Sequence, residues 1–266
     1  MSDQERARYA PLVSVIMPAY RGGDLIRRSV GSVQAQTIPD WEILIVDDCS
    51  PDDTYERLIG LSREDMRIRV FQTPVNSGPA VARNIALENA RGTYAAFLDS
   101  DDFWMEDKLE RQIAFMERKN AAFSCTAYDR VAEDGTVINR VTPYEKADYN
   151  RVLYCANPVG NSTAMIDRRI LGDLRVPLIR KRNDFALWLK ALKITDYVYG
   201  MSDCLTRYSV RTGSVSSNKV ELLRYQWELY RKVEGLDLGR TMLAFAGLAY
   251  TMVARPTWHG AGRKDI

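Results

Sequence analysis

The sequence predicts an α/β fold with a doubly wound, mostly parallel sheet, helices on both faces of that sheet and a helical extension at the C-terminus. Apolar runs of strand length alternate with segments of helical periodicity over the first 120 residues, the pattern of repeated β–α–β units. Acidic residues follow directly after two of the apolar runs. The chain of 266 residues is 46% hydrophobic and 27% charged, a composition sufficient for a packed core.

The first predicted strand is the short apolar run 13–17, and apolar residues at helical spacing follow over 25–33. The second strand is predicted over 41–46, and it leads directly into Asp47 and Asp48. The serine and aspartates that come next are typical of a helix start. The first carboxylates of interest therefore lie at the end of a buried strand.

The third strand is predicted over 67–71. Pro79 suits the first turn of the next helix, and Gly92 is expected to end that helix. The fourth strand, 93–98, leads directly into Asp99. Because doubly wound sheets bind ligands at the carboxyl ends of their strands, the acidic residues after the second and fourth strands are expected to share one site.

Beyond residue 120 the regular alternation ends, and shorter elements are expected. These elements are a strand over 121–128, its hairpin partner over 136–140, a helix from about Arg182, a strand over 203–210 and two helices from Val220 onwards.

Composition and charge exclude several classes of protein. A net charge of +2 is too small to indicate nucleic-acid binding on electrostatic grounds. Four scattered cysteines and a single histidine, His259, make a zinc site unexpected and are typical of reduced, cytoplasmic thiols. The first ten residues are polar and lack the apolar segment of a signal peptide.

The longest apolar segment, 241–254, is shorter than the roughly 18 residues needed to span a bilayer. Arg240 and Arg255 flank it. We interpret it as a buried helix in preference to a helix on a membrane surface, because it is short and only moderately apolar.

Asp99, Ser100 and Asp101 form the strongest candidate site. Two carboxylates two residues apart suit a hard cation such as Mg²⁺ or Mn²⁺, and a diphosphate would add oxygen ligands of its own. The ion would act as a Lewis acid that neutralises charge on a departing phosphate. The alternative is a solvated acidic turn, because this spacing is frequent by chance. The position at the end of a buried strand favours the metal site.

Asp47 and Asp48 are candidates for nucleotide binding, since a carboxylate at a strand end can accept hydrogen bonds from a nucleobase or a ribose hydroxyl. Helix capping is the alternative, and it is more natural for Asp48 than for Asp47. Pro18, Ala19 and Tyr20 close the first strand beside a pair of glycines. The ring of Tyr20 either stacks on a base or belongs to an ordinary turn.

Two charged residues in predicted helices are further candidates. Arg83 either lies on a solvated helix face or places a cation near base or phosphate. Asp184 is the candidate catalytic base, although a first-turn carboxylate that complements the helix dipole is equally consistent. The basic run 180–182 before it would attract a diphosphate or remain a solvated loop. Neither G-x-G-x-x-G nor a P-loop signature is present, so a dinucleotide fingerprint is missing and P-loop hydrolysis is excluded.

Five ordered stretches together carry a family resemblance. They are VSVIMPAY (13–20), WEILIVDDCSPDDT (41–54), NSGPAVARNIALENARGTYAAFLDSDD (76–102), RKRNDFALWLK (180–190) and LTRYSVRTGSVSSNK (205–219). With these stretches the chain resembles family 2 glycosyltransferases, which have the GT-A fold, and within them the variant of bacterial polysaccharide and teichuronic-acid assembly.

The resemblance implies a role for each matching residue. A metal ion, Mn²⁺ or Mg²⁺, would be held by Asp99 and Asp101, with Asp99 nearer the ribose. Asp184 would be the general base, which removes the proton of the acceptor hydroxyl while the oxygen attacks the anomeric carbon from behind and inverts its configuration. The donor, a UDP-sugar, would be bound by Pro18, Ala19, Tyr20, Asp47, Asp48, Arg83, Asp99, Ser100 and Arg211.

The chain departs from the family pattern in three places. Asn183 precedes Asp184 where many members have glutamate, and Arg211 stands where many have a histidine metal ligand. Arginine cannot ligate a metal but can pair with phosphate, so Arg211 and Ser214 are expected on a lid over the donor. The processive signature Q-x-x-R-W is absent, which predicts the transfer of a single sugar.

The resemblance also predicts the domain organisation. A GT-A glycosyltransferase domain is expected over 1–219, with a nucleotide-binding half (12–119) and an acceptor half with the lid (120–219), followed by a helical extension (220–266). The acceptor is expected to be a hydroxyl of a cell-surface glycan or a polyprenyl-linked one. The protein is expected in the cytoplasm, with peripheral contact at the inner face of the cytoplasmic membrane through the C-terminal helices.

Two other functions share part of this pattern. A sugar nucleotidyltransferase or pyrophosphorylase has a similar sheet and metal carboxylates, but it needs a glycine-rich basic loop, of which residues 21–23 are a poor version. A non-catalytic nucleotide-sugar-binding domain would have the same fold without turnover.

Overall fold

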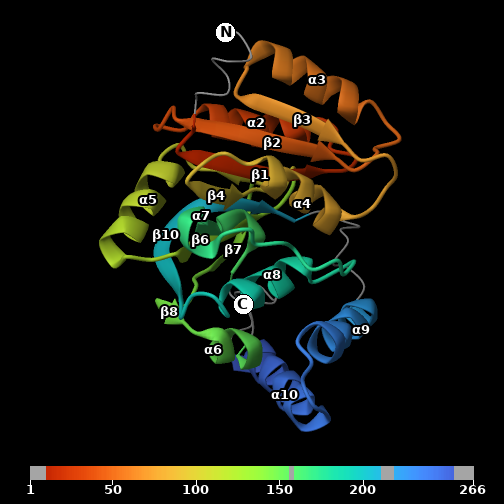
Figure 1. Cartoon of the computed structure of the whole chain (residues 1–266), viewed down its shortest axis with the longest axis vertical. Coiled ribbons are helices and arrows are strands. Elements are labelled where there is room, and N and C mark those ends of the chain that lie inside the picture. Colours follow the sequence, from red (N-terminus) through yellow and green to blue (C-terminus); the bar gives the residue numbers. More distant parts are fainter. Residues whose placement is uncertain (1–9, 156–158, 211–218, 255–266) are drawn as a thin grey trace.

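The computed structural model describes residues 10–155, 159–210 and 219–254. Within these residues ten strands form one mixed sheet in the order β3-β2-β1-β4-β9-β6-β10-β5, with β7 paired to β6 and β8 to β10 (Figure 1). The strands are β1 (Val13–Ala19), β2 (Trp41–Asp47), β3 (Ile68–Gln72), β4 (Tyr94–Phe97), β5 (Phe103–Trp104), β6 (Phe123–Val131), β7 (Val137–Val141), β8 (Lys146–Ala147), β9 (Met165–Asp167) and β10 (Val198–Ser209). The helices are α2 (Leu25–Gln34), α3 (Thr54–Glu64), α4 (Pro79–Asn89), α5 (Lys108–Lys119), α6 (Tyr149–Tyr154), η1 (Asn161–Thr163), α7 (Arg168–Leu171), α8 (Asn183–Ala191), α9 (Lys219–Glu228), η2 (Leu229–Val233) and α10 (Leu238–Ala254).

The first four strands confirm the predicted parallel unit, each within two residues of its expected bounds. β1 pairs with β2 on one side and with β4 on the other, and β3 pairs with β2, all in parallel. The strand order therefore reverses at β1, and the carboxyl end of β1 is the switch point at which sheets of this kind bind ligands.

Helices cover both faces of the sheet, as predicted. On one face Val15 and Ile43 pack with α2, α3 and α5. On the other face Ile16 and Leu44 pack with α4 and α8. Because neighbouring residues of a strand point to opposite faces, strands buried on both sides read as unbroken apolar runs.

The second half of the sheet is mixed. β9 lies between β4 and β6 and is antiparallel to each, whereas β10 runs parallel to β6. The predicted hairpin is confirmed, since β6 and β7 pair in antiparallel. The predicted strand 203–210 is the second part of β10, which begins at Val198. The helix expected from about Arg182 is α8, and it buries the predicted stripe that includes Trp188.

The two helices expected after Val220 are present as α9 and α10, joined by the π-helical turn η2. They lie at the end of the molecule opposite α3 and β3 (Figure 1). The expectation of a buried helix over 241–254 holds for one face of α10 only: Thr241, Ala244 and Thr251 are buried, while its other face is exposed. No helix in the described part of the chain combines the length and the apolar character needed to cross a membrane.

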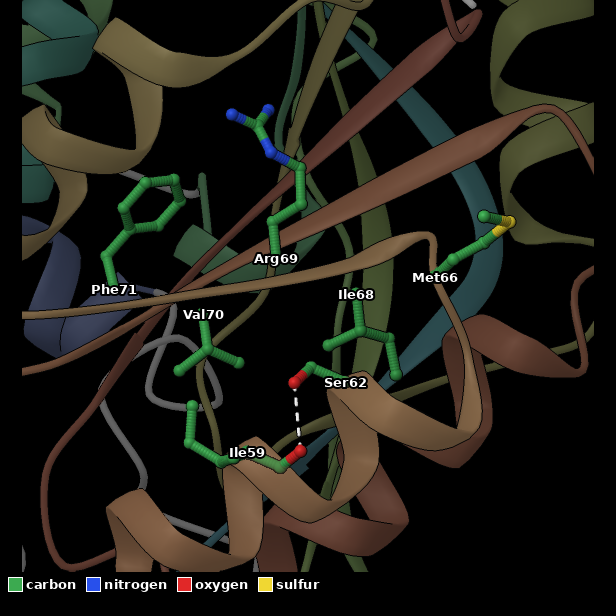
Figure 2. A pocket seen from close by; sticks show the side chains of 7 residues that line it. All are labelled: Ile59, Ser62, Met66, Ile68, Arg69, Val70 and Phe71. Carbon is green, nitrogen blue, oxygen red and sulfur yellow. Dashed lines mark hydrogen bonds between the residues drawn. The ribbon is translucent and has the colours of Figure 1, made fainter. Parts of the chain in front are cut away.

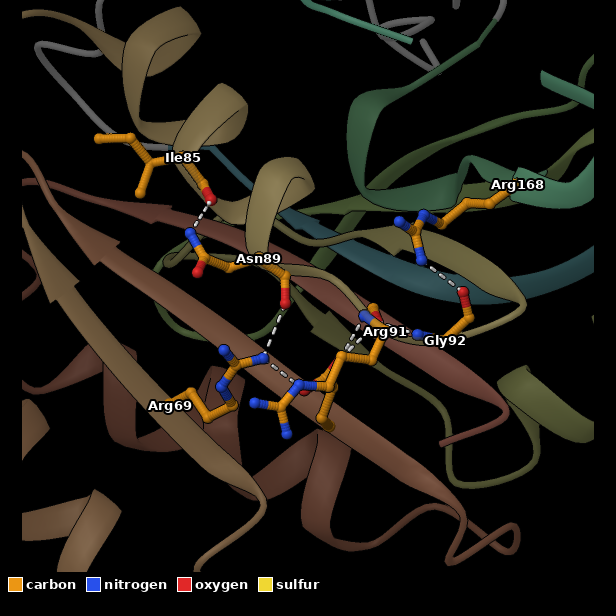
Figure 3. Close-up of polar contacts among 8 residues, drawn as sticks. Arg69, Ile85, Asn89, Arg91, Gly92 and Arg168 are labelled. Carbon is orange, nitrogen blue, oxygen red and sulfur yellow. Dashed lines mark hydrogen bonds and ion pairs between the residues drawn. The ribbon is translucent and has the colours of Figure 1, made fainter. Parts of the chain in front are cut away.

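Gly92 does not end helix α4 as predicted, because the helix already ends at Asn89 with Ala90 as its cap. The glycine is needed for a close approach instead. A Cβ at this position would lie 2.5 Å from the backbone nitrogen of Ser14, and the Gly92 N–H donates to the Ser14 hydroxyl at 2.8 Å. Figure 3 shows the surrounding contacts, in which Arg69 donates to the carbonyl of Asn89 and Arg168 to that of Gly92.

Candidate functional site

The candidate site lies where β1, β2 and β4 end. Asp47 is the last residue of β2 and is paired with Ala19 of β1, while Asp99 follows two residues after Phe97 of β4. β1 separates the two carboxylate-bearing strands, so they lie two strand spacings, about 10 Å, apart. The structure therefore brings Asp47 and Asp99 to the same edge of the sheet, on either side of the switch point.

Asp99 is held by side chains from two elements, α4 and η1. One of its oxygens, Oδ1, accepts hydrogen bonds from Arg83 Nη2 at 2.6 Å and from Asn161 Nδ2 at 2.8 Å. The second terminal nitrogen of Arg83 donates to Asn183 Oδ1 at 2.7 Å. Arg83 thus ties the end of β4 to the first residue of α8, directly beside the half-buried Asp184.

Asp102 is a further carboxyl group beside Asp99 and Asp101, and the sequence did not predict it as part of the site. It is 1% exposed and accepts hydrogen bonds from the Ser162 hydroxyl and from the Ser209 N–H, the latter at 2.9 Å. Burial raises the pKa of the Asp102 carboxyl well above its usual range, and the charges of Asp101 and Asp99 raise it further. Three carboxylates therefore lie within electrostatic reach of one another.

Two tyrosines connect this acidic cluster with Asp184. Burial raises the pKa of Tyr128 to about 12, and the charges of Asp102 and Asp184 both act in the same direction. The ring of Tyr128 lies 5.9 Å from that of Tyr208, whose pKa is raised by burial and by the same acidic cluster. Asp184 and the acidic residues after β4 therefore lie around one pair of side chains, Tyr128 and Tyr208. No signal in the sequence identified these tyrosines, because β6 and β10 become neighbours only in the folded sheet.

Asp47 and Asp48 have different environments. Asp47 is fully buried and accepts hydrogen bonds from the Ser50 hydroxyl at 2.5 Å and from Gln72 Nε2 at 3.0 Å. The two oxygens of Asp48 accept the backbone N–H groups of Ser77 and Gly78, at 2.8 and 2.7 Å. Asp48 therefore does not cap helix α3. It fixes the turn that leads into α4 instead.

Tyr20 lies at the same edge, after Pro18 and Ala19 at the end of β1. Its side chain is 44% exposed, with the guanidinium of Arg21 at 5.4 Å from the ring centroid. The Arg21 N–H donates to the Ser50 hydroxyl at 2.9 Å. An exposed ring beside the ends of β1 and β2 is placed where a planar base could stack.

The residues after β4 suit a hard cation that arrives together with a diphosphate. Within residues 10–155, 159–210 and 219–254, no group of three Asp, Glu, His or Cys side chains is arranged to hold a metal ion alone. Asp99 and Asp101 nevertheless supply carboxylate oxygens, which are the ligands that a hard cation prefers. Oxygens of a bound diphosphate would complete such a site.

Some predicted contributors have other positions. Ser100 is half-buried beside α2, and its carbonyl accepts the hydroxyl of Ser29 at 2.9 Å. Lys181, in the basic run before α8, pairs with Glu221 at 2.7 Å. Arg211 and Ser214, expected on a lid, lie outside the described residues.

A separate hollow of about 360 Å³ lies on the outer edge of the sheet, between α3 and β3 (Figure 2). β3 is the terminal strand of the sheet, and two strands, β2 and β1, separate it from β4 and the acidic residues that follow β4. The hollow is open, and it contains none of the predicted site residues. Its lining residues are Ile59, Ser62, Met66, Ile68, Arg69, Val70 and Phe71.

Comparison with known proteins identifies relatives across nearly the whole chain. The family described as glycosyl transferase family 2 matches residues 14–175. A Bacillus subtilis protein named for teichuronic acid biosynthesis as a glycosyltransferase, TuaG, is 42% identical over 253 residues, which cover 93% of this chain and 98% of the relative. The Escherichia coli UDP-Glc:α-D-GlcNAc-diphosphoundecaprenol β-1,3-glucosyltransferase WfgD is 36% identical, covering 82% of this chain and 85% of its own.

Solved structures of glycosyltransferases have a similar fold. Residues 1–349 of Staphylococcus aureus TarS, solved in complex with UDP, superpose with a TM-score of 0.69 at 22% identity, covering 91% of this chain and 72% of that one. The mannosyltransferase PcManGT from Pyrobaculum calidifontis, solved with GDP-Man and Mn²⁺, gives a TM-score of 0.63 at 18% identity, covering 93% and 76%. At such identities the similarity establishes the fold.

Proposed function

The chain belongs to glycosyl transferase family 2, and from this premise we propose that it moves one sugar from a UDP-sugar to a hydroxyl of a cell-envelope glycan or polyprenyl-linked acceptor, with inversion at the anomeric carbon. Family membership makes the protein a sugar-transferring enzyme. It therefore excludes the two alternative functions, a sugar nucleotidyltransferase and a non-catalytic nucleotide-sugar-binding domain. The observation that carries the proposal is the junction at Arg83, which links Asp99 on the donor side to the start of α8, where Asp184 lies.

The proposed donor is a UDP-sugar. WfgD is named for UDP-Glc, and TarS has been solved with UDP and with UDP-GlcNAc. In this chain the exposed ring of Tyr20 would stack on the uracil, and the carboxylate of Asp47 would lie beside the base or ribose. Asp48 and Arg83 would contribute indirectly, by holding the turn into α4 and the carboxylate of Asp99.

Asp99 and Asp101 would hold a divalent ion, Mn²⁺ or Mg²⁺, against the diphosphate. PcManGT, which has the same fold, was solved with Mn²⁺. Bound there, the ion would supply neutralisation of the charge that builds on the leaving UDP. Buried Asp102 keeps this segment in place, because its carboxylate is bonded to Ser162 and to the end of β10 at Ser209.

Asp184 would accept the proton of the acceptor hydroxyl as the oxygen attacks the anomeric carbon. Attack occurs from the side opposite the departing phosphate, so the product has the inverted configuration. The hydrogen bond from Arg83 to Asn183 fixes the start of α8, and this position next to Asp184 supports the proposed role of Asp184. The names of WfgD and the B. subtilis relative support an acceptor of envelope glycan assembly.

A screen of nucleotide-sugars for thermal stabilisation tests the donor proposal. UDP-Glc, UDP-GlcNAc and GDP-Man are added with Mn²⁺, with Mg²⁺ or with EDTA. We expect a UDP-sugar with metal to raise Tm by about 5–10 °C at about a hundredfold excess over Kd, since a ligand of the folded state adds to its stability. No stabilisation by any UDP-sugar, or equal stabilisation in EDTA, contradicts the proposal.

A further inference from the structure

The residues that follow β4 form a tight turn. The N–H of Asp102 donates to the carbonyl of Asp99 at 3.1 Å, which closes a β-turn with Ser100 and Asp101 at its centre. Because Ser100 lies between Asp99 and Asp101, its backbone conformation sets the direction of one carboxylate relative to the other. The carbonyls of Ser100 and Asp101 take no part in the closing bond, so they need partners from outside the turn.

Helix α2 provides partners for both of these carbonyls. The Ser29 hydroxyl donates to the carbonyl of Ser100 at 2.9 Å, and Arg28 Nη2 donates to the carbonyl of Asp101 at 3.2 Å. The Ser209 hydroxyl donates to the same Asp101 carbonyl at 2.6 Å. The turn is therefore fixed from outside by α2 and by the end of β10.

The polar contacts of α2 continue along the chain after the turn. Ser29, Ser32 and Gln36 are three and four residues apart, so they share one side of the helix. The Ser32 hydroxyl accepts the N–H of Trp104 at 3.1 Å. Gln36 Nε2 donates to the carbonyl of Met105 at 2.7 Å. Each of these side chains bonds to the backbone, so together they fix the path that the chain takes after β4.

Ser29 has a second acceptor within reach, because its hydroxyl lies 3.2 Å from the carbonyl of Leu25 in the same helix. A serine inside a helix often bonds in this way. The hydroxyl of Ser29 carries one hydrogen, and the carbonyl of Ser100 is the closer acceptor. The carbonyl of Leu25 also accepts a backbone N–H of the helix. Ser29 is fully buried, and its contact with the turn is the bond that depends on this side chain.

We propose that Ser29 is a positioning residue for the metal site, which holds the turn in the conformation in which Asp99 and Asp101 bind one divalent cation. Arg28 supports the same conformation through the carbonyl of Asp101. This inference rests on the proposed function, because the cation is the one assigned there to the two aspartates. Removal of the Ser29 hydroxyl leaves both carboxylates in place but allows the turn between them to change conformation, so the affinity for the cation falls.

Titration of the full chain with Mn²⁺ in the presence of UDP tests this role. The EPR signal of free Mn²⁺ gives the Kd, with the same UDP solution without protein as the blank. The test variant is Ser29→Ala, since alanine suits a helix interior. The matched control is Ser14→Ala. It removes another fully buried hydroxyl, near the opposite end of β1, where Ser14 donates to Glu42 and accepts the N–H of Gly92.

We expect Tm to fall by about 2–8 °C in both variants, since each leaves polar backbone groups without their partner. The Kd for Mn²⁺ should rise about tenfold in Ser29→Ala and stay within about twofold of wild type in Ser14→Ala. Absence of Mn²⁺ binding by the wild type would overturn the proposed metal site and this inference with it. Wild-type binding that Ser29→Ala matches, or that Ser14→Ala weakens equally, would overturn the positioning role alone.

Arg28→Gln provides a second variant, because Arg28 is exposed and its replacement leaves the core intact. Loss of a cation beside the site would by itself favour the binding of Mn²⁺. A higher Kd for Mn²⁺ in Arg28→Gln therefore reports the lost contact with the Asp101 carbonyl and supports the proposal. An equal or lower Kd contradicts the supporting role of Arg28.

Discussion

At the residue scale, the guanidinium of Arg83 is the point at which two parts of the site meet. It is 6% exposed, and its two terminal nitrogens are engaged by Asp99 and Asn183. The sequence predicted a cation near the nucleotide. The structure places the Arg83 guanidinium behind the residues expected to contact the nucleotide. It lies between the Asp99 carboxylate and the start of helix α8. Asn183 is neutral, so Asp99 is the carboxylate that pairs with Arg83.

The role proposed for Asp184 is tested by Asp184→Asn, which keeps the size of the side chain but cannot accept a proton. We expect kcat to fall by about 10²–10⁴-fold, the usual contribution of general-base catalysis. Stabilisation by UDP and Mn²⁺ should be unchanged. The measurement is transfer of labelled sugar from the preferred UDP-sugar to membrane-extracted acceptor, with exposed Asp173→Asn as the control. Turnover equal to wild type would remove Asp184 from the mechanism.

Asp102 offers a second test at this scale. Asparagine can accept from the Ser209 N–H and donate to the Ser162 hydroxyl, so Asp102→Asn keeps two hydrogen bonds and removes a buried carboxyl whose charged form is disfavoured by burial and by Asp99 and Asp101. We expect it to be as stable as wild type or more stable. Asp102→Ala should lose about 1–3 kcal/mol, because both buried partners become unsatisfied. Urea unfolding of the two variants distinguishes them, and equal destabilisation would contradict this account of the contacts.

At the element scale, the sheet depends on one close approach between the start of β1 and the turn before β4. Gly92 lies there against the backbone of Val13 and Ser14. The sequence correctly marked Gly92 as a special position but assigned it to a helix end. Close packing of two backbone segments leaves no periodic pattern in the sequence. The reason why position 92 needs glycine was therefore visible only in the fold.

Gly92→Ala is expected to lower the free energy of unfolding by about 1–3 kcal/mol, since backbone atoms must move to admit the methyl group. Gly31→Ala in α2 is the matched control, because a Cβ there meets nothing within 4 Å. Alanine in a helix interior is neutral or stabilising. Urea denaturation measures the two variants, and a Gly92→Ala protein as stable as Gly31→Ala would show that the approach is looser than described.

At the scale of the whole molecule, the predicted GT-A fold is confirmed by the sheet and by the solved glycosyltransferases of similar structure. The first four strands were predictable because each is an apolar run bounded by turn residues, and the placement of Asp47 and Asp99 followed from strand order alone. Asn161, Tyr128 and Tyr208 were not predictable. They reach the site through β6, β9 and β10, whose mixed pairing joins segments distant in sequence. The division at residue 219 and the residue roles stay predictions.

Calorimetric titration of UDP in the presence of Mn²⁺, with Asp101→Ala beside the wild type, tests the central claim most directly. Asp134→Ala, in the exposed β6–β7 turn, controls for loss of a carboxylate. The account predicts wild-type binding that EDTA abolishes, and an Asp101→Ala affinity lower by at least about tenfold, as one lost charge-assisted ligand costs more than 1.4 kcal/mol. Metal-dependent UDP binding of wild-type strength in Asp101→Ala would contradict it.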